Sequence, residues 1–168
     1  MAVGIVVAAV LGLTSVYADS ADLTRAMTLY HQTLGTTLFG LVLFRAVWRL
    51  THPVPPPLAH TPAGQRIAAA ATHALLYVML IFLPITGYVG LAARGREISM
   101  LGFVNLPNIV PLSRPLSVNA QSLHSYGQYF LYALILMHVG AALYHHYVLK
   151  DGLMRRMMIG NTLIKTSR

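Results

Sequence analysis

The stretch that most constrains the fold is the final apolar segment, residues 121–149, which reads QSLHSYGQYFLYALILMHVGAALYHHYVL. As a helix it is long enough to cross a hydrocarbon layer about 30 Å thick. Two of its histidines, His124 and His138, are 14 residues apart. At about 100° per residue they lie on nearly the same helix face, about 21 Å apart along the axis. Titratable side chains inside a membrane span are costly and are usually retained for a function. Because neutral imidazole is a strong ligand for haem iron and brings no charge into the bilayer, we interpret the two histidines as axial ligands of two haems.

The composition supports a membrane protein. Hydrophobic residues make up 56% of the 168 residues and charged residues only 10%, and the mean hydropathy is +0.62. The chain has no cysteine, which excludes disulfides, iron–sulfur clusters, thiolate zinc sites and a cysteine nucleophile. The net charge of +8 comes from basic residues at the ends of apolar segments and in short loops. That distribution is typical of membrane topology and argues against a nucleic-acid partner.

Four apolar segments predict an all-α integral membrane four-helix bundle that forms a single membrane domain over residues 1–168. The expected helices cover residues 2–18, 29–50, 67–93 and 121–149, and a basic tail covers 150–168. The first segment starts almost at the initiator Met and looks clipped at its front, which favours a natural start upstream. A cleaved signal peptide is the alternative, but no Lys or Arg precedes the apolar run.

The basic residues also predict the orientation in the membrane. Eight flank one side, at the junction of the second and third segments and in the tail, and four lie in the other two loops. The richer side is expected to be cytoplasmic. This places both termini in the cytoplasm, with the chain as a multi-pass membrane protein.

His31 lies near the front of the second segment, one turn before Gly35 and on the same segment as Gly40. Glycines let a neighbouring backbone or a flat macrocycle approach a helix closely. The predicted topology puts His31 and His124 at the same depth, toward the outer face, so we expect them to bind the same haem. The alternative is that His31 is an interfacial histidine hydrogen-bonded to lipid headgroups.

Four further positions have other candidate roles. His73, near the start of the third segment, could be a haem ligand, a partner of a haem propionate or quinone, or a packed core histidine. Arg45, at the end of the second segment, is a candidate contact for a haem propionate. His52 and His60 lie in or beside the proline-rich linker and are expected to be solvated.

The end of the fourth segment carries His145 and His146, flanked by Tyr144 and Tyr147. These histidines could hydrogen-bond a quinone carbonyl near the inner face. Equally, they could be interfacial residues without a ligand.

The segments together resemble the bacterial cytochrome b561 family. The resemblance rests on His31-(x3)-Gly35 followed by LVLFRAVWRL and a proline-rich linker, on His73 with LLYVMLIFLPITGY, and above all on LHSYGQYFLYALILMHVGAALYHHYVLKDGLMRRM. It implies a four-helix inner-membrane cytochrome with two b haems. His31 and His124 would be the axial pair of the outer haem, and His138 one ligand of the inner haem.

This chain departs from the family pattern at its front. In the family the second ligand of the inner haem is a histidine at the start of the first helix, and no histidine precedes His31 here. Either the start codon has been placed too far downstream, or the inner haem is ligated otherwise, with His73 as the nearest spare histidine, or the inner haem is absent.

The family includes proteins that resemble superoxide oxidases, which implies electron transfer from superoxide at the outer haem to ubiquinone. Arg94, Arg96 and Arg114 in the long outer loop would attract such an anion, or they are ordinary loop charges. One alternative is a cytochrome subunit that anchors a partner dehydrogenase or hydrogenase. A non-redox metal-ion carrier is disfavoured, because no acidic residue lies inside any apolar segment.

Overall fold

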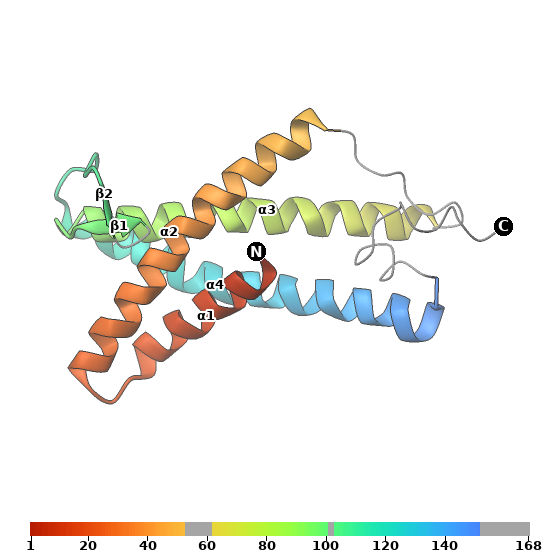
Figure 1. Ribbon diagram of the computed structural model, residues 1–168, viewed down its shortest axis with the longest axis horizontal. Coiled ribbons are helices and arrows are strands. Elements are labelled where there is room, and N and C mark those ends of the chain that lie inside the picture. Colours follow the sequence, from red (N-terminus) through yellow and green to blue (C-terminus); the bar gives the residue numbers. More distant parts are fainter. Residues whose placement is uncertain (53–61, 101–102, 152–168) are drawn as a thin grey trace. The chain divides into compact units, whose positions relative to one another are not determined.

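The computed structural model describes residues 1–52, 62–100 and 103–151. Its helices are α1 (Ala2–Tyr17), α2 (Ala21–Thr51), α3 (Ala63–Ala92) and α4 (Arg114–Tyr144), which continues into a π-helical turn at His145–Leu149. Two short strands, β1 (Ile98–Met100) and β2 (Val104–Leu106), lie between α3 and α4 (Figure 1). The prediction of a four-helix membrane protein is confirmed. His60 and most of the basic tail fall outside the described residues.

Three of the helices are suited to cross a membrane. The helix over Ala21–Thr51, the helix over Ala63–Ala92 and the continuous helical stretch Arg114–Leu149 are long and apolar enough, and α1 is a shorter apolar helix of 16 residues. Large apolar side chains remain exposed on these helices, including Phe44 (67%), Leu50 (87%) and Leu136 (73%). Lipid chains are as apolar as leucine, so such exposure is expected of a helix surrounded by lipid.

Three helices begin earlier than the hydropathy indicates, α2 at Ala21, α3 at Ala63 and α4 at Arg114, and serine caps account for two of them. The N-cap of α2 is Ser20, whose hydroxyl accepts a hydrogen bond from Leu23 N at 3.2 Å. Similarly, the Ser113 hydroxyl accepts from Leu116 N at 3.3 Å just before α4 begins. The first turns of both helices are polar, so an apolar window detects only the later turns, whereas the serine caps fix the actual starts.

The described chain divides into two compact units. The first contains the described parts of residues 1–52 and 77–129, and the second contains those of residues 62–76 and 130–151. In the first unit α1 lies against α2, and β1 also packs on α2 (Figure 1). Its buried core includes Leu38 and Val42 of α2 and Leu83 and Ala92 of α3. In the second unit, Leu131 and Leu134 of α4 are buried.

The connection between α3 and α4 is more ordered than the sequence indicates. β1 and β2 pair antiparallel, with Ile98 opposite Leu106 and Met100 opposite Val104. Gly95 supplies the positive φ of 71° that the chain needs as it leaves α3. Asn108 Nδ2 donates to the Ala92 carbonyl at 3.0 Å, so the segment after β2 is fixed to the end of α3.

Candidate functional site

His31 of α2 and His124 of α4 face each other in the first unit. Their ring centroids are 5.9 Å apart and their planes are almost perpendicular, at 88°. Both side chains are partly buried. The structure therefore brings together the two histidines that the sequence analysis pairs at one depth, although they lie far apart in the chain.

Each of the two imidazoles is oriented by a backbone carbonyl on a third helix. His31 Nδ1 lies 2.7 Å from the Ala8 carbonyl of α1, and His124 Nδ1 lies 2.8 Å from the Leu83 carbonyl of α3. A carbonyl can only accept, so each Nδ1 carries the hydrogen and donates it. In the neutral ring, Nε2 then keeps its lone pair free, which is the form that ligates a metal.

This geometry fits an axial ligand pair. A separation of about 6 Å between ring centroids leaves room for one metal ion between two ring nitrogens, each about 2 Å from it. At Gly35, one turn after His31, an added Cβ would meet no atom of the described chain within 4 Å, so the helix surface there is open. The donor chemistry, the spacing and the open helix surface all suit a flat macrocycle with an imidazole on each face.

The described residues contain no group of three or more His, Cys, Asp or Glu side chains that could hold a bare metal ion. Two imidazoles alone do not complete the coordination shell of such an ion. They do complete that of an iron whose other ligands come from a porphyrin.

A second pair of histidines lies in the second unit. The rings of His73 on α3 and His138 on α4 have centroids 5.3 Å apart and planes at 65°. Both side chains are partly buried. The sequence leaves three roles open for His73: haem ligand, partner of a haem propionate or quinone, and packed core histidine. Its position beside His138 favours a role at the haem that His138 is a candidate to bind.

Arg45 and His52, near the end of α2, have partners within the chain. Arg45 Nε donates to the Tyr77 hydroxyl at 3.1 Å, and the Arg49 guanidinium lies 6.0 Å from the centroid of the Tyr77 ring. The His52 ring stacks on that of Trp48, with 3.7 Å between centroids, and its Nδ1 lies 3.0 Å from the Trp48 carbonyl.

The π-helical turn at the end of α4 carries His145 and His146. His145 Nδ1 hydrogen-bonds the Asp151 carboxylate, whereas His146 is exposed with its ring 4.7 Å from that of Tyr147. π-helical turns are rare and occur often at functional sites. Asp151 was missed in the sequence analysis, although its position six residues after His145, just past the end of an apolar segment, was the available signal.

Arg94, which follows α3, is fixed by a buried serine. Arg94 Nε donates to Ser117 Oγ at 2.6 Å, and Ser117 donates in turn to the Gly90 carbonyl at 2.6 Å. Ser117 is fully buried while Arg94 is exposed. The sequence analysis identified Arg94 but missed Ser117, because nothing in the pattern RPLSVNA distinguishes a buried serine from a loop serine.

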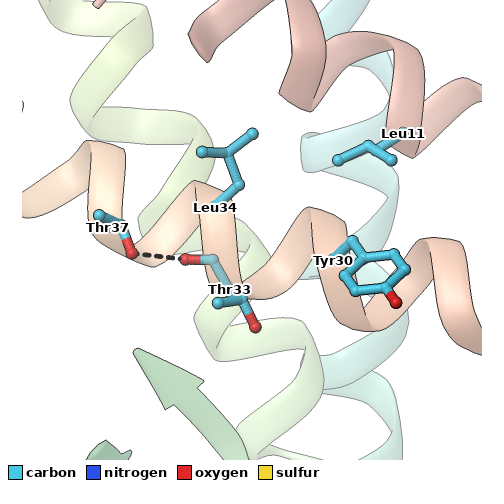
Figure 2. Close-up of a pocket in the computed structure, with 5 residues that line it drawn as sticks. All are labelled: Leu11, Tyr30, Thr33, Leu34 and Thr37. Carbon is cyan, nitrogen blue, oxygen red and sulfur yellow. Dashed lines mark hydrogen bonds between the residues drawn. The ribbon is translucent and has the colours of Figure 1, made fainter. Parts of the chain in front are cut away.

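A largely apolar pocket of about 440 Å³ opens between α1 and α2 (Figure 2). It is lined by Leu11, Tyr30, Thr33, Leu34 and Thr37. The Thr37 hydroxyl donates to the Thr33 carbonyl at 2.7 Å, so only its lone pairs remain available to a ligand. The pocket lies on the face of α2 next to that of His31, and the sequence analysis did not predict it.

These features define a helical membrane protein with a pair of oriented imidazoles, the class to which b-type cytochromes belong. Comparison with known proteins agrees. The family model described as prokaryotic cytochrome b561 matches residues 1–160. The chain belongs to the prokaryotic cytochrome b561 family and is a membrane cytochrome that binds haem b and transfers electrons.

Three relatives show the extent of the similarity. Cytochrome b561 homolog 2 of Escherichia coli (strain K12) is 32% identical over 128 residues, which cover 76% of this chain and 68% of the relative. Cytochrome b561 homolog 1 of the same organism is 36% identical over 132 residues, covering 76% and 72%. The protein named "Probable superoxide oxidase CybB" of Yersinia pestis is 31% identical over 133 residues, covering 79% and 74%.

Proposed function

We propose that this chain binds one haem b between His31 and His124 and passes electrons from superoxide, on the outer side of the membrane, to ubiquinone. The observation that carries the proposal is the facing pair of imidazole rings, whose centroids are 5.9 Å apart. Each ring donates its Nδ1–H to a backbone carbonyl. Haem b, when bound, supplies reversible one-electron oxidation and reduction. The two histidines would hold the haem, and the apolar helices around them would exclude water from it.

The overall reaction balances without a catalytic acid or base at the histidine pair. Two superoxide anions each lose one electron and leave as dioxygen. One ubiquinone accepts the two electrons and takes two protons from the aqueous side, forming ubiquinol. The similarity to a protein named as a probable superoxide oxidase supports superoxide as the donor.

Arginine side chains supply the attraction for the anion. Arg94 follows α3 and Arg114 opens α4, and both are exposed. The hydrogen bond that Arg94 Nε donates to Ser117 Oγ fixes the base of that guanidinium and leaves its terminal nitrogens available to an anion. A fixed positive group lowers the orientational cost of meeting a small anion.

The quinone is assigned to the end of α4, at His145 and His146. A carboxylate hydrogen-bonded to one imidazole nitrogen, as Asp151 is to His145, fixes the orientation of the ring. The exposed His146 can donate a ring N–H to a quinone carbonyl. The two tyrosines flanking the histidines provide apolar ring surface for the quinone head.

A second haem is proposed at His138, with His73 beside it. The two rings are neighbours in the second unit, with centroids 5.3 Å apart. Because α4 also carries His124, both haem sites then share one helix. Arg45 remains the candidate contact for a propionate, with its Nε bond to Tyr77 setting the direction of its side chain.

The test of the first site is a reduced-minus-oxidised spectrum with pyridine-haemochrome quantitation on the purified protein. We expect a bis-histidine b-type spectrum for the wild type, and loss of about one haem per chain in His31→Ala and in His124→Ala. His52→Ala, in which a histidine that stacks on Trp48 is removed, serves as the matched control and should keep the wild-type haem content. A wild-type protein without haem would exclude the proposal.

The donor and acceptor are tested separately on the same preparations. Superoxide generated enzymatically should drive reduction of a soluble ubiquinone by the wild type and not by His124→Ala. Turnover by the isolated chain distinguishes this function from that of a cytochrome subunit anchoring a partner dehydrogenase. Haem without any superoxide-dependent quinone reduction would favour the anchoring role.

A further inference from the structure

The two histidines of the first unit share one local arrangement, although they come from different helices and contact different partners. His31 Nδ1 donates to the carbonyl of Ala8 on α1, and His124 Nδ1 donates to the carbonyl of Leu83 on α3. In each partner helix a glycine follows that carbonyl by four residues, Gly12 in α1 and Gly87 in α3. The arrangement of carbonyl, glycine and imidazole therefore occurs twice.

The spacing of four residues has a direct structural meaning. In an α-helix the carbonyl of residue i accepts from the N–H of residue i+4. The glycine thus lies directly over the carbonyl that receives the imidazole hydrogen. A carbonyl oxygen has two lone pairs, so it can serve its own helix and the histidine where the helix surface above it is open, and the Leu83 carbonyl also accepts from the Thr86 hydroxyl at 2.9 Å.

Both glycines leave no room for such a side chain. A Cβ at Gly12 would lie 3.0 Å from both Cε1 and Nδ1 of His31, and a Cβ at Gly87 would lie 3.1 Å and 3.2 Å from Cε1 and Nδ1 of His124. The neighbouring atoms belong to a rigid ring rather than to the end of a flexible side chain. A ring that is tied to a carbonyl through Nδ1 and to a metal through Nε2 cannot rotate away without weakening one of the two bonds.

We propose that Gly12 and Gly87 are positioning residues of the haem site: each leaves the space in which an axial histidine lies against a neighbouring helix and donates Nδ1–H to the carbonyl one turn earlier. The inference rests on the proposed ligation by His31 and His124. The hydrogen bond makes the imidazole a stronger electron donor, which stabilises the oxidised metal. A methyl group at either glycine moves the ring, weakens this bond and shifts the reduction potential upward.

The test compares Gly12→Ala with Gly4→Ala on the same helix. The Cβ of an alanine at position 4 would also approach a neighbour to 3.0 Å, but that neighbour is Cδ2 of Leu38, a flexible side-chain end. The pair therefore matches in helix, substitution and contact distance, and differs in whether a histidine is touched. Gly40→Ala, whose Cβ would meet no described atom within 4 Å, is the second control.

Three readouts are measured on each purified variant: haem per chain, the electron paramagnetic resonance spectrum of the oxidised low-spin iron, and the midpoint potential. The resonance spectrum depends on the angle between the two imidazole planes, which is 88° here. We expect Gly12→Ala and Gly87→Ala to lose haem, or to retain it with a changed resonance spectrum and a raised potential. Gly4→Ala and Gly40→Ala should match the wild type in all three readouts.

A double-variant comparison covers the case in which the alanine variants insert or fold poorly. In the haem-depleted protein, any loss of yield or unfolding temperature caused by Gly12→Ala should disappear when His31→Ala is also present, because the clashing ring is gone. A loss that persists in the double variant would overturn the inference, as would a Gly12→Ala protein with the spectrum and potential of Gly4→Ala. Absence of haem from the wild type would instead refute the proposed function.

Discussion

Ser117 joins α3 to α4 through two hydrogen bonds, one donated to the Gly90 carbonyl and one accepted from Arg94. Its side chain is fully buried, with none of its surface exposed. Gly90 makes this approach possible, since a Cβ there would come within 3.3 Å of Gln121 Oε1. A buried hydroxyl that both donates and accepts links the stability of the helix pair to the position of an exposed guanidinium.

Replacing Ser117 with alanine should therefore destabilise the protein and release Arg94. Loss of the serine hydroxyl leaves a buried carbonyl with one partner fewer and a guanidinium nitrogen without its acceptor, so we expect the free energy of unfolding to fall by about 1–3 kcal/mol. Thermal unfolding in detergent measures the change. The exposed Ser122, on the same helix, provides the control variant Ser122→Ala. Equal unfolding temperatures for the two variants would contradict the prediction.

The proposal for His138 is also tested at the scale of one residue. His138→Ala should lower haem per chain by about one, because the imidazole is the proposed ligand of the second haem. The resonance signal assigned to the His31 and His124 pair should remain, since those residues belong to the other unit. Haemochrome quantitation gives the result. Unchanged haem content would remove His138 from the ligand set.

At the scale of the elements, the ends of α3 and α4 gather positive charge around a short hairpin. Arg94 and Arg96 follow α3, and Arg114 is the first residue of α4. Glu97 is the one acidic residue in the long loop that contains them. This excess of positive charge is the physical basis of the proposed attraction for superoxide.

Neutralising the three arginines to glutamine should slow superoxide-driven quinone reduction on the order of tenfold at low salt and weaken its dependence on ionic strength. The measurement is the initial rate over a series of salt concentrations. Arg25→Gln is the matched control, since Arg25 is exposed on α2 and lies 3.6 Å from Asp22. A triple variant with the salt dependence of the wild type would show that these arginines do not guide the donor.

The elements also show what the sequence could and could not predict. Apolar runs located all four helices, because a long apolar run in lipid has few alternatives to a helix. They did not locate the starts of α2 and α4, which depend on the caps Ser20 and Ser113 rather than on hydropathy. The hairpin β1–β2 was missed because three-residue strands are too short to carry a periodic signal.

The candidate site was predictable in part: its histidines were identified from the sequence, but their hydrogen-bond acceptors were not. Spacing and topology paired His31 with His124, and the structure places their rings 5.9 Å apart. The carbonyls of Ala8 and Leu83 could not be identified, since they depend on the rotation of α1 and α3 about their own axes. No side-chain pattern in a single sequence specifies which carbonyl faces a neighbouring helix.

At the scale of the whole molecule, the distribution of arginine and lysine predicts how the chain lies in the membrane. The side with eight basic residues should face the cytoplasm, so both termini should lie there. Fluorescent protein fused to the C-terminus should therefore fluoresce, and alkaline phosphatase fused at the same place should be inactive. Fusions within the loop between α3 and α4 should give the reverse pattern. An active phosphatase at the C-terminus would invert the topology and move the proposed superoxide side to the other face.

The acceptors of the two imidazole hydrogens are main-chain atoms, and this has a consequence for how the family can diverge. The identity of residue 8 or 83 can change over generations without removing the oxygen that selects the tautomer, provided that the helix persists. Substitutions at these two positions therefore leave the chemistry of the histidine pair unchanged. The glycines at positions 12 and 87 have no such freedom. Related proteins should therefore vary in sequence at positions 8 and 83 and keep glycine at positions 12 and 87.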